Sequence, residues 1–409
     1  MRYLGTSRHP RRGHRTLIAW PGYHSGLPID SFDRHVVGAI AKPLAHAGGD
    51  SQLIAAALAA GMGVVLPGET WRNQLPRRHK KRTGAFSQLA SHRPGMQVDP
   101  DARRFPATFA ERLAEDNLNE QLSAGATLAT TPPHVLEREA GDGRQNDLQL
   151  ARLTAEVFAS RRAFAPAPGR TGRRELYATL IVQGCHAADR RTVEWLATTY
   201  AGLEGIDGYW IVAANTTRSA KQLRGYTRLA LLLERLSERP VAMFGVGHPH
   251  LAFLASGVAA TCAGLYGMNF KFPPDELALG EDDEEPLRLA VHTYHRDILG
   301  NAGQLGREGD ALRERLFHNR PCDCPHHEPD RPPLGRSAII RHNSWCVQAD
   351  ARSLAEAAVV DAELQLVERI TLAQRNRAFH GLTPLPTGFA AVAVEAARLR
   401  DGKSQLGDV

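Results

Sequence analysis

The sequence predicts an α/β protein, a closed (β/α)₈ barrel of the TIM type followed by a zinc-binding C-terminal subdomain. Short apolar segments alternate with longer amphipathic ones, which is typical of βα units and a parallel sheet. Many such units follow one another in one chain, and a long run of them favours a closed barrel over an open sheet. A cluster of cysteine and histidine near the C-terminus predicts the subdomain.

Six pairs of a helix and a following strand can be traced along the chain. Each pair joins an amphipathic segment to a short run rich in Val, Ile, Leu and Ala, and the predicted ranges are 50–60 with 64–66, 108–122 with 126–129, 146–161 with 176–182, 191–202 with 208–213, 220–238 with 241–246, and a short helix after Pro249, ending at Gly257, with 258–262. The apolar window from Leu53 to Leu66 is too short to span a bilayer. We therefore expect it in the core and expect no membrane partner.

Composition is that of an ordinary soluble globular protein, with 409 residues, 43% hydrophobic and 23% charged. The net charge of +6 is compatible with a polyanionic partner such as a nucleic acid. Five cysteines, three of them close together, favour a reducing compartment over a disulfide framework, so we expect a cytoplasmic protein. We expect four regions: a basic tail (1–15), the barrel (16–320), a zinc-binding helical subdomain (321–395) and a C-terminal tail (396–409).

Residues 322–327 read C-D-C-P-H-H, and R-H-N follows at 341–343. Two thiolates one residue apart and an imidazole three residues further on can close around one tetrahedral Zn²⁺, and a second imidazole completes the set. We predict one structural zinc ion bound by Cys322, Cys324, His327 and His342, with Cys346 as the alternative fourth ligand because it lies one turn after His342. A proline-rich loop with incidental histidines is the alternative without a metal.

Three blocks between residues 180 and 258 share the order and spacing of one family's motifs. Residues 180–185 read L-I-V-Q-G-C before D-R-R at 189–191, residues 206–209 read I-D-G-Y, and 239–258 contain R-P, M, G-V-G, P and G-V at matching places. These blocks resemble the queuine and archaeosine tRNA-guanine transglycosylases. The cysteine–histidine cluster, followed by a helix that begins His-Asn, is similar to the zinc subdomain of the archaeal members. The resemblance covers about residues 64 to 375.

The resemblance implies a pentosyltransferase that exchanges guanine for a 7-deazaguanine-type base in tRNA or DNA. In that chemistry a carboxylate attacks C1′ of a guanosine, displaces guanine, and is displaced in turn by the incoming base. By the same resemblance Gln183 and Gly184 contact the base, and Thr131 falls near the position of a base-reading aspartate. The family's nucleophilic aspartate falls on Cys262, and a further family aspartate falls on Arg82.

Three explanations stay open for the replaced aspartates. In the first, relocated groups act, such as Glu69 or Asp99, which are carboxylates placed after strands, or Cys262 as a thiol nucleophile. Cys262 is alternatively a small buried strand residue. In the second, the chain is a non-catalytic partner subunit or nucleic-acid-binding paralogue, as a homodimer or with a catalytic homologue. In the third, it is a divergent member directed to DNA.

A basic run, R-R-H-K-K-R, occupies residues 77–82. Clustered Lys and Arg release counterions from a nucleic acid, so Arg78, Lys80, Lys81 and Arg82 are candidate phosphate contacts. A solvated loop is the alternative interpretation.

Overall fold

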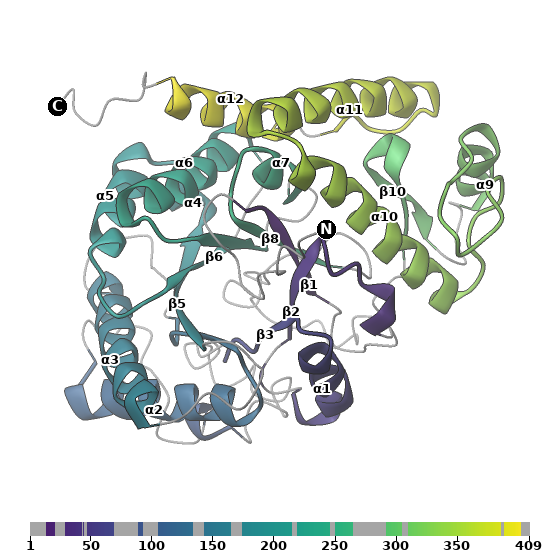
Figure 1. Cartoon of the computed structure of the whole chain (residues 1–409). Helices are drawn as coiled ribbons and strands as arrows, with labels where there is room; N and C mark the ends of the chain where they lie inside the picture. The colour runs from purple at the N-terminus through teal and green to yellow at the C-terminus, as the bar shows by residue number, and fades with distance from the viewer. Residues whose placement is uncertain are drawn as a thin grey trace, which may run out of the picture.

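Eight parallel strands close into a barrel in the computed structural model (Figure 1). The structure describes residues 14–20, 29–42, 44, 47–68, 89–92, 105–133, 143–164, 174–214, 219–245, 250–264, 292–304, 310–385 and 388–401. The strands pair in sequence order and β8 pairs back to β1; they are β1 (Thr16–Trp20), β2 (Val37–Ala41), β3 (Gly63–Val65), β4 (Leu128–Thr130), β5 (Glu175–Gln183), β6 (Gly208–Ala214), β7 (Val241–Phe244) and β8 (Ala260–Gly264). The predicted (β/α)₈ barrel is confirmed.

Helices follow most of the strands and surround the sheet. They are α1 (Ser51–Ala59), α2 (Ala107–Ser123), α3 (Gly143–Phe164), α4 (Gly184–Ala187), α5 (Arg190–Ala201), α6 (Ala220–Ser237) and α7 (His250–Ala255), with the 3₁₀ turns η1 (Ile29–Ser31), η3 (Gly48–Asp50) and η7 (Ala90–His92). All six predicted helix–strand pairs are present, with ends within three residues of those expected. Strands β1 and β2 were not predicted.

Alternate strand residues divide the core into two clusters. Ile18, Val65, Tyr177 and Phe244 belong to the inward cluster that fills the barrel, whereas their strand neighbours pack outward beneath the helices. Because both faces of every strand are covered, the strands are apolar almost throughout, as expected for a parallel sheet. None of the described helices is long and apolar enough to cross a membrane.

Side chains of α6 tie this helix to the strands that it covers. The hydroxyl of Tyr226 donates to the carbonyls of Val182 and Ala214, at 2.7 and 3.1 Å, where β5 and β6 end. Gly225 lies against the backbone of α4, because a Cβ there would come within 1.6 Å of the Ala187 carbonyl oxygen. The helix thus holds the ends of two strands in place at the mouth of the barrel.

At the opposite end of α6, the buried carboxylate of Glu234 accepts hydrogen bonds from two strand-starting amides. The N–H groups of Val241 and Ala259 both donate to its Oε1, at 3.0 and 2.9 Å.

We expect Glu234→Leu to lower the free energy of unfolding by about 2 to 6 kcal/mol, since two buried N–H groups lose their acceptor. Glu234→Gln keeps an amide oxygen there and should retain most of the stability. Urea denaturation of both variants checks this, and equal losses would contradict it.

The C-terminal region packs across one side of the barrel (Figure 1). It comprises the hairpin β9 (His292–His295) and β10 (Gly300–Gln304), the turn η8 (Arg296–Ile298), and the helices α9 (Asp310–Asn319), α10 (Arg336–Glu356), α11 (Val359–Phe379) and α12 (Gly388–Arg400). Strands β9 and β10 pair with each other and not with the barrel. Gln348 of α10 reaches the barrel, where its amide bonds the Asp33 N–H and the Ser31 carbonyl. The predicted boundary after residue 320 falls between α9 and α10, and the one after 395 falls inside α12.

Candidate metal centre and barrel mouth

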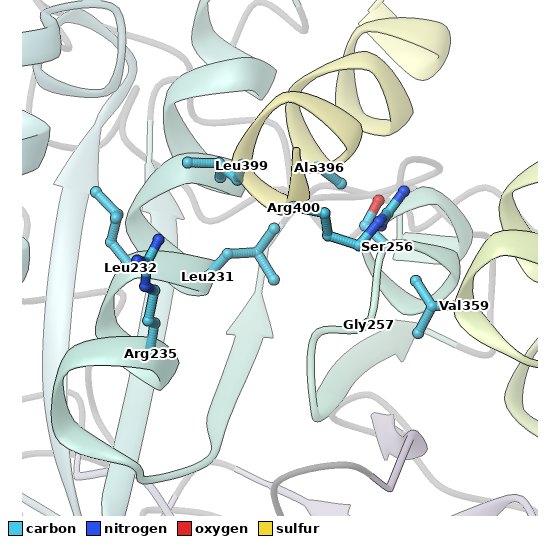
Figure 2. A pocket seen from close by; sticks show the side chains of 9 residues that line it. All are labelled: Leu231, Leu232, Arg235, Ser256, Gly257, Val359, Ala396, Leu399 and Arg400. Carbon is cyan, nitrogen blue, oxygen red and sulfur yellow. The ribbon is translucent and has the colours of Figure 1, made fainter. Parts of the chain in front are cut away.

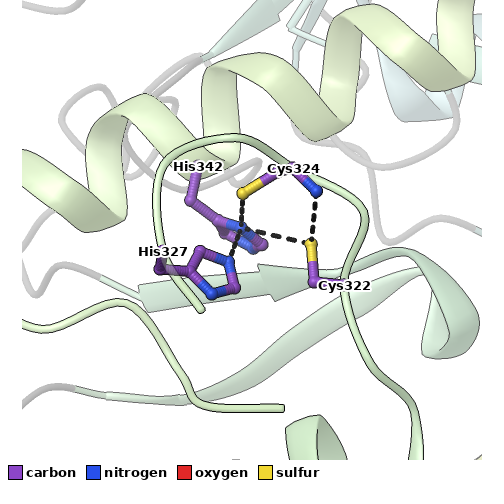
Figure 3. Close-up of side chains that lie close together, drawn as sticks. All are labelled: Cys322, Cys324, His327 and His342. Atoms are coloured by element: carbon purple, nitrogen blue, oxygen red, sulfur yellow. Dashed lines mark hydrogen bonds between the residues drawn. The ribbon is translucent and has the colours of Figure 1, made fainter. Parts of the chain in front are cut away.

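Four side chains converge in the loop between α9 and α10 (Figure 3). Cys322, Cys324 and His327 come from the loop and His342 from the second turn of α10, and one donor atom from each lies within 4.8 Å of all the others. The His342 Nδ1 lies 3.7 Å from the Cys322 Sγ, 3.2 Å from the Cys324 Sγ and 2.9 Å from the His327 Nε2. Tetrahedral ligands of one zinc ion lie about 3.3 to 3.8 Å apart. The Cys₂His₂ cluster can therefore bind a metal ion.

Backbone carbonyls determine which nitrogen of each imidazole faces the cluster. The His342 Nε2 lies 2.6 Å from the Tyr294 carbonyl oxygen, and the His327 Nδ1 lies 2.7 Å from that of Glu328. A carbonyl only accepts, so these nitrogens carry the protons. The two remaining nitrogens then face each other as lone pairs at 2.9 Å, an arrangement that a shared cation stabilises.

The His-Asn pair lies in the second turn of α10, which begins at Arg336 and not at the pair as expected, and it holds strand β9 beside the cluster. His342 donates to the carbonyl of Tyr294, and the Asn343 Oδ1 accepts the N–H of the same residue at 2.8 Å. The ring of Phe317 from α9 covers the two imidazoles at centroid distances of 5.3 and 5.5 Å. The cluster therefore joins the hairpin, α9 and α10 at one point.

Hydrogen bonding distinguishes the two loop thiols. The pKa of Cys322 is lowered, chiefly because its sulfur accepts a hydrogen bond from Cys324, and the same contact raises the pKa of Cys324. The backbone N–H of Cys324 also points at the Cys322 sulfur, 3.4 Å away. This N–H stabilises a thiolate at Cys322, the form of the thiol that a metal requires.

Cys346, the alternative ligand, lies beside the cluster on the next turn of α10. Its sulfur is 3.6 Å from the His342 Nε2, the nitrogen that faces Tyr294, and 3.8 Å from Nδ1. Burial raises its pKa well above the usual value. The group of donors close enough to share an ion holds Cys322, Cys324, His327 and His342 without Cys346.

A buried carboxylate that the sequence analysis missed stabilises the surroundings of the cluster. Asp350 of α10 accepts hydrogen bonds from the Tyr294 hydroxyl at 3.1 Å, the Arg296 Nε at 2.7 Å and the Arg369 Nη1 at 3.0 Å. The Arg296 guanidinium also reaches Asp323, between the two loop cysteines, at 3.2 Å. Asp350 thereby connects the hairpin, α10 and α11, and Arg296 extends this network to the loop that carries the two cysteines.

Two of the predicted base-binding residues lie where β5 ends, on the side of a barrel where active sites collect. Gln183 is the last residue of β5 and the N-cap of α4, and the buried Gly184 begins that helix. Thr131 follows β4 and is buried, with its hydroxyl accepting the N–H of Thr179 at 2.9 Å. Thr131 is thus level with Thr179, four residues or about 13 Å before Gln183 along β5, so the strands bring Gln183 and Gly184 together but not Thr131. Base contact by these residues stays a prediction.

Cys262 lies inside the barrel, on β8 opposite Ile18 of β1. The rings of Trp20, Trp210 and Phe244 fill the interior near it, with centroids 4.8 and 5.4 Å from that of Phe244. Burial raises the pKa of the Cys262 thiol, which is the opposite of the shift that activates a nucleophile. A catalytic role for this thiol remains a prediction.

The other predicted site residues, Glu69, Asp99, Arg78, Lys80, Lys81 and Arg82, lie outside the described residues. Sequence analysis also missed Lys42, which follows β2 directly and is fully buried. A lysine immediately after the apolar run V-G-A-I-A is the signal that could have identified it.

A cavity of about 470 Å³ lies outside the barrel (Figure 2). Its walls come from α6, the turn at Ser256 and Gly257, the first residue of α11 (Val359) and the last turn of α12. The α6 end and the turn lead into β7 and β8, so the cavity lies at the N-terminal ends of the strands. Catalytic residues of such barrels collect at the opposite ends, and the cavity is therefore separate from the candidate mouth.

Comparisons with known proteins assign no family. No family model and no curated protein matches the chain. Among solved structures it is similar to a putative phosphonomutase from Burkholderia cenocepacia J2315, with 18% identity over 63% of this chain and 88% of that one and a TM-score of 0.35. This likeness assigns no reaction, and the barrel is established by the strand pairing itself.

Proposed function

We propose that the protein is a transglycosylase-like enzyme that exchanges guanine for a 7-deazaguanine-type base in a nucleic acid, tRNA or DNA. The observation that carries the proposal is the occurrence in one chain of a closed barrel, a Gln-Gly pair at the end of β5, and a Cys₂His₂ cluster attached to the first turns of α10. These are the three parts that the resemblance to tRNA-guanine transglycosylases requires together.

The metal of the cluster is proposed to be a single structural Zn²⁺. Two thiolates and two imidazoles form one of the usual zinc sets, and four protein ligands leave no position open for a reactive water. When bound, the ion would hold the hairpin, α9 and α10 together, and it would supply no chemistry at the barrel mouth.

In the proposed exchange, a nucleotide turned out of its strand is bound at the barrel mouth. The amide of Gln183 can donate and accept at a purine edge, and the backbone of Gly184 allows close approach of a base. The candidate nucleophiles are Glu69, Asp99 and Cys262. The basic run that contains Arg78, Lys80, Lys81 and Arg82 would contact phosphates of the polymer.

A non-catalytic role is the second candidate, and one observation favours it. The residue at the position of the family's nucleophile, Cys262, is a thiol whose pKa is raised by burial. A subunit with the barrel and metal cluster but no nucleophile would act beside a catalytic homologue, or bind nucleic acid without changing it. The protein is proposed to act in the cytoplasm in either case.

Incorporation of labelled guanine or preQ₁ into tRNA and into DNA tests the proposed exchange. We expect incorporation into one of the two polymers and a loss of at least about 1,000-fold in the variant that lacks the nucleophile, among Cys262→Ala, Glu69→Gln and Asp99→Asn. Asp330→Asn, at an exposed acid in the loop between α9 and α10, is the matched control for the carboxylate variants. Absence of exchange into either polymer, with tight association to a catalytic homologue, would favour the partner subunit.

A further inference from the structure

Helix α11 carries a row of large apolar side chains that nothing in the described part of the chain covers. Of the nine large hydrophobic residues exposed there, five belong to this helix, namely Val360, Leu364, Val367, Leu372 and Phe379, with Leu364 and Phe379 59% and 79% exposed. The buried side of the helix already packs inward through Ala362, Leu366 and Ala373. Large apolar side chains exposed together along one helix are typical of interaction sites.

The row has a mirrored order of side chains. Leu364, Glu368, Leu372, Arg375 and Phe379 are separated by steps of three or four residues, so they share one side of the helix. Their midpoint lies between residues 371 and 372. Glu368 and Arg375, which carry opposite charges, lie at equal distances on the two sides of this midpoint. The apolar Leu364 and Phe379 lie further out, again at equal distances from it.

The two charges are available to a partner. Glu368 and Arg375 are exposed, and within the part of the chain that the structure describes neither forms an ion pair. They lie two helical turns apart, about 10 Å along the axis. A partner that forms an ion pair with both Glu368 and Arg375 must present a basic and an acidic side chain at this spacing. A second copy of α11, packed antiparallel to the first, presents its Arg375 to Glu368 and its Glu368 to Arg375.

We propose that α11 is the contact surface of a symmetric homodimer, in which two copies of the helix pack antiparallel about a two-fold axis between Thr371 and Leu372. Each Glu368 then faces Arg375 of the second copy, and each Leu364 faces Phe379. A two-fold contact uses the same patch on both subunits and must be self-complementary, which the mirrored order provides. If the partner were a helix of another protein, only the surface of that helix would have to complement α11. The mirrored order of side chains within α11 would then have no explanation.

The contact uses no residue of the barrel mouth or of the metal cluster. A dimer without base exchange, or base exchange by a monomer, therefore separates this proposal from the function proposed above. The charged pairs determine the register, and the apolar pairs supply most of the buried area.

The test is the mass of the intact protein by light scattering and sedimentation over a range of concentrations. The wild type should reach twice the chain mass of 44.7 kDa. In a homodimer of either single variant, Glu368→Arg or Arg375→Glu, two pairs of like charges face each other across the contact. Each variant should therefore raise the dimer Kd about 10- to 100-fold. The doubly reversed variant should dimerise like the wild type. An equimolar mixture of the two single variants should form heterodimers, because every facing pair is then opposite in charge.

Phe379→Asp should also yield monomers, whereas Leu236→Asp, an exposed leucine on α6, is the matched control and should leave the dimer intact. Circular dichroism of each variant checks that it is folded. A wild type that stays monomeric at all concentrations would overturn the proposal, and so would a dimer that neither charge reversal weakens, since another surface would then form it.

Discussion

Replacement of Cys324 by serine is expected to abolish metal binding and to lower the free energy of unfolding of the C-terminal region by several kcal/mol. The thiol lies 3.2 Å from the His342 Nδ1, and serine is a poor ligand for a cation held by thiolates. In zinc-finger peptides, zinc binding contributes about 10 to 16 kcal/mol, which is folding free energy when the unfolded chain has no preformed site. Here α9, α10 and the hairpin also bury apolar side chains, so a partial loss is expected.

Two measurements check this result, the metal content of the purified variant and its unfolding by urea with and without a chelator. The wild type should lose stability when the chelator is added, and Cys324→Ser should be insensitive to it. Cys185→Ser makes the same chemical change at an exposed thiol and should behave like the wild type. A Cys324→Ser variant that retains both metal and stability would contradict the proposed ligand set.

Replacement of Asp350 by alanine is expected to lower the free energy of unfolding by about 3 to 5 kcal/mol. The carboxylate is 1% exposed and faces two guanidinium groups, those of Arg296 and Arg369. Burial lowers the pKa of Arg296, but Asp350 more than offsets this, so its pKa lies above the usual value and it stays charged. Removing Asp350 takes a buried charged partner from two half-buried guanidinium groups, and the Asp323 carboxylate that Arg296 keeps is exposed, which accounts for the size of the loss.

Denaturant unfolding of Asp350→Ala gives this free energy, and Asp330→Ala, an exposed acid in the metal loop, is the control. The free energy of unfolding of Asp350→Asn should lie between those of Asp350→Ala and the control, because the amide oxygen of asparagine still accepts hydrogen bonds but carries no charge. If Asp350→Ala were as stable as the control, the two arginines would have to find other acceptors, and the account of this network would be wrong.

The strands that could be predicted are those that follow an amphipathic helix. Strands β3 to β8 were found because each follows a helix whose polar and apolar positions alternate at helical spacing. Between β1 and β2 the described residues contain only the short turn η1, so that signal is missing. The sequences of β1 and β2, T-L-I-A-W and V-G-A-I-A, are five residues long and carry no local signal that distinguishes a strand from another buried segment. Their pairing in the closed barrel identifies them as strands.

The metal cluster could be predicted because its ligands lie close together in the sequence, within 20 residues. The Asp350 network could not be predicted, since the partners of this carboxylate come from β9, the η8 turn and α11. The same holds for Glu234, whose two backbone donors are the first residue of β7 and the residue before β8. Interactions that depend on packing between distant segments leave no local pattern of residues.

The cluster of Cys322, Cys324, His327 and His342 is the centre of this account, and metal analysis combined with X-ray absorption spectroscopy of the wild-type protein tests it most directly. We predict one zinc per chain, with two sulfur ligands at about 2.3 Å and two nitrogen ligands at about 2.0 to 2.1 Å. Three sulfur ligands would mean that Cys346 replaces a histidine. Protein purified without any metal, and unable to take up zinc, would contradict the account.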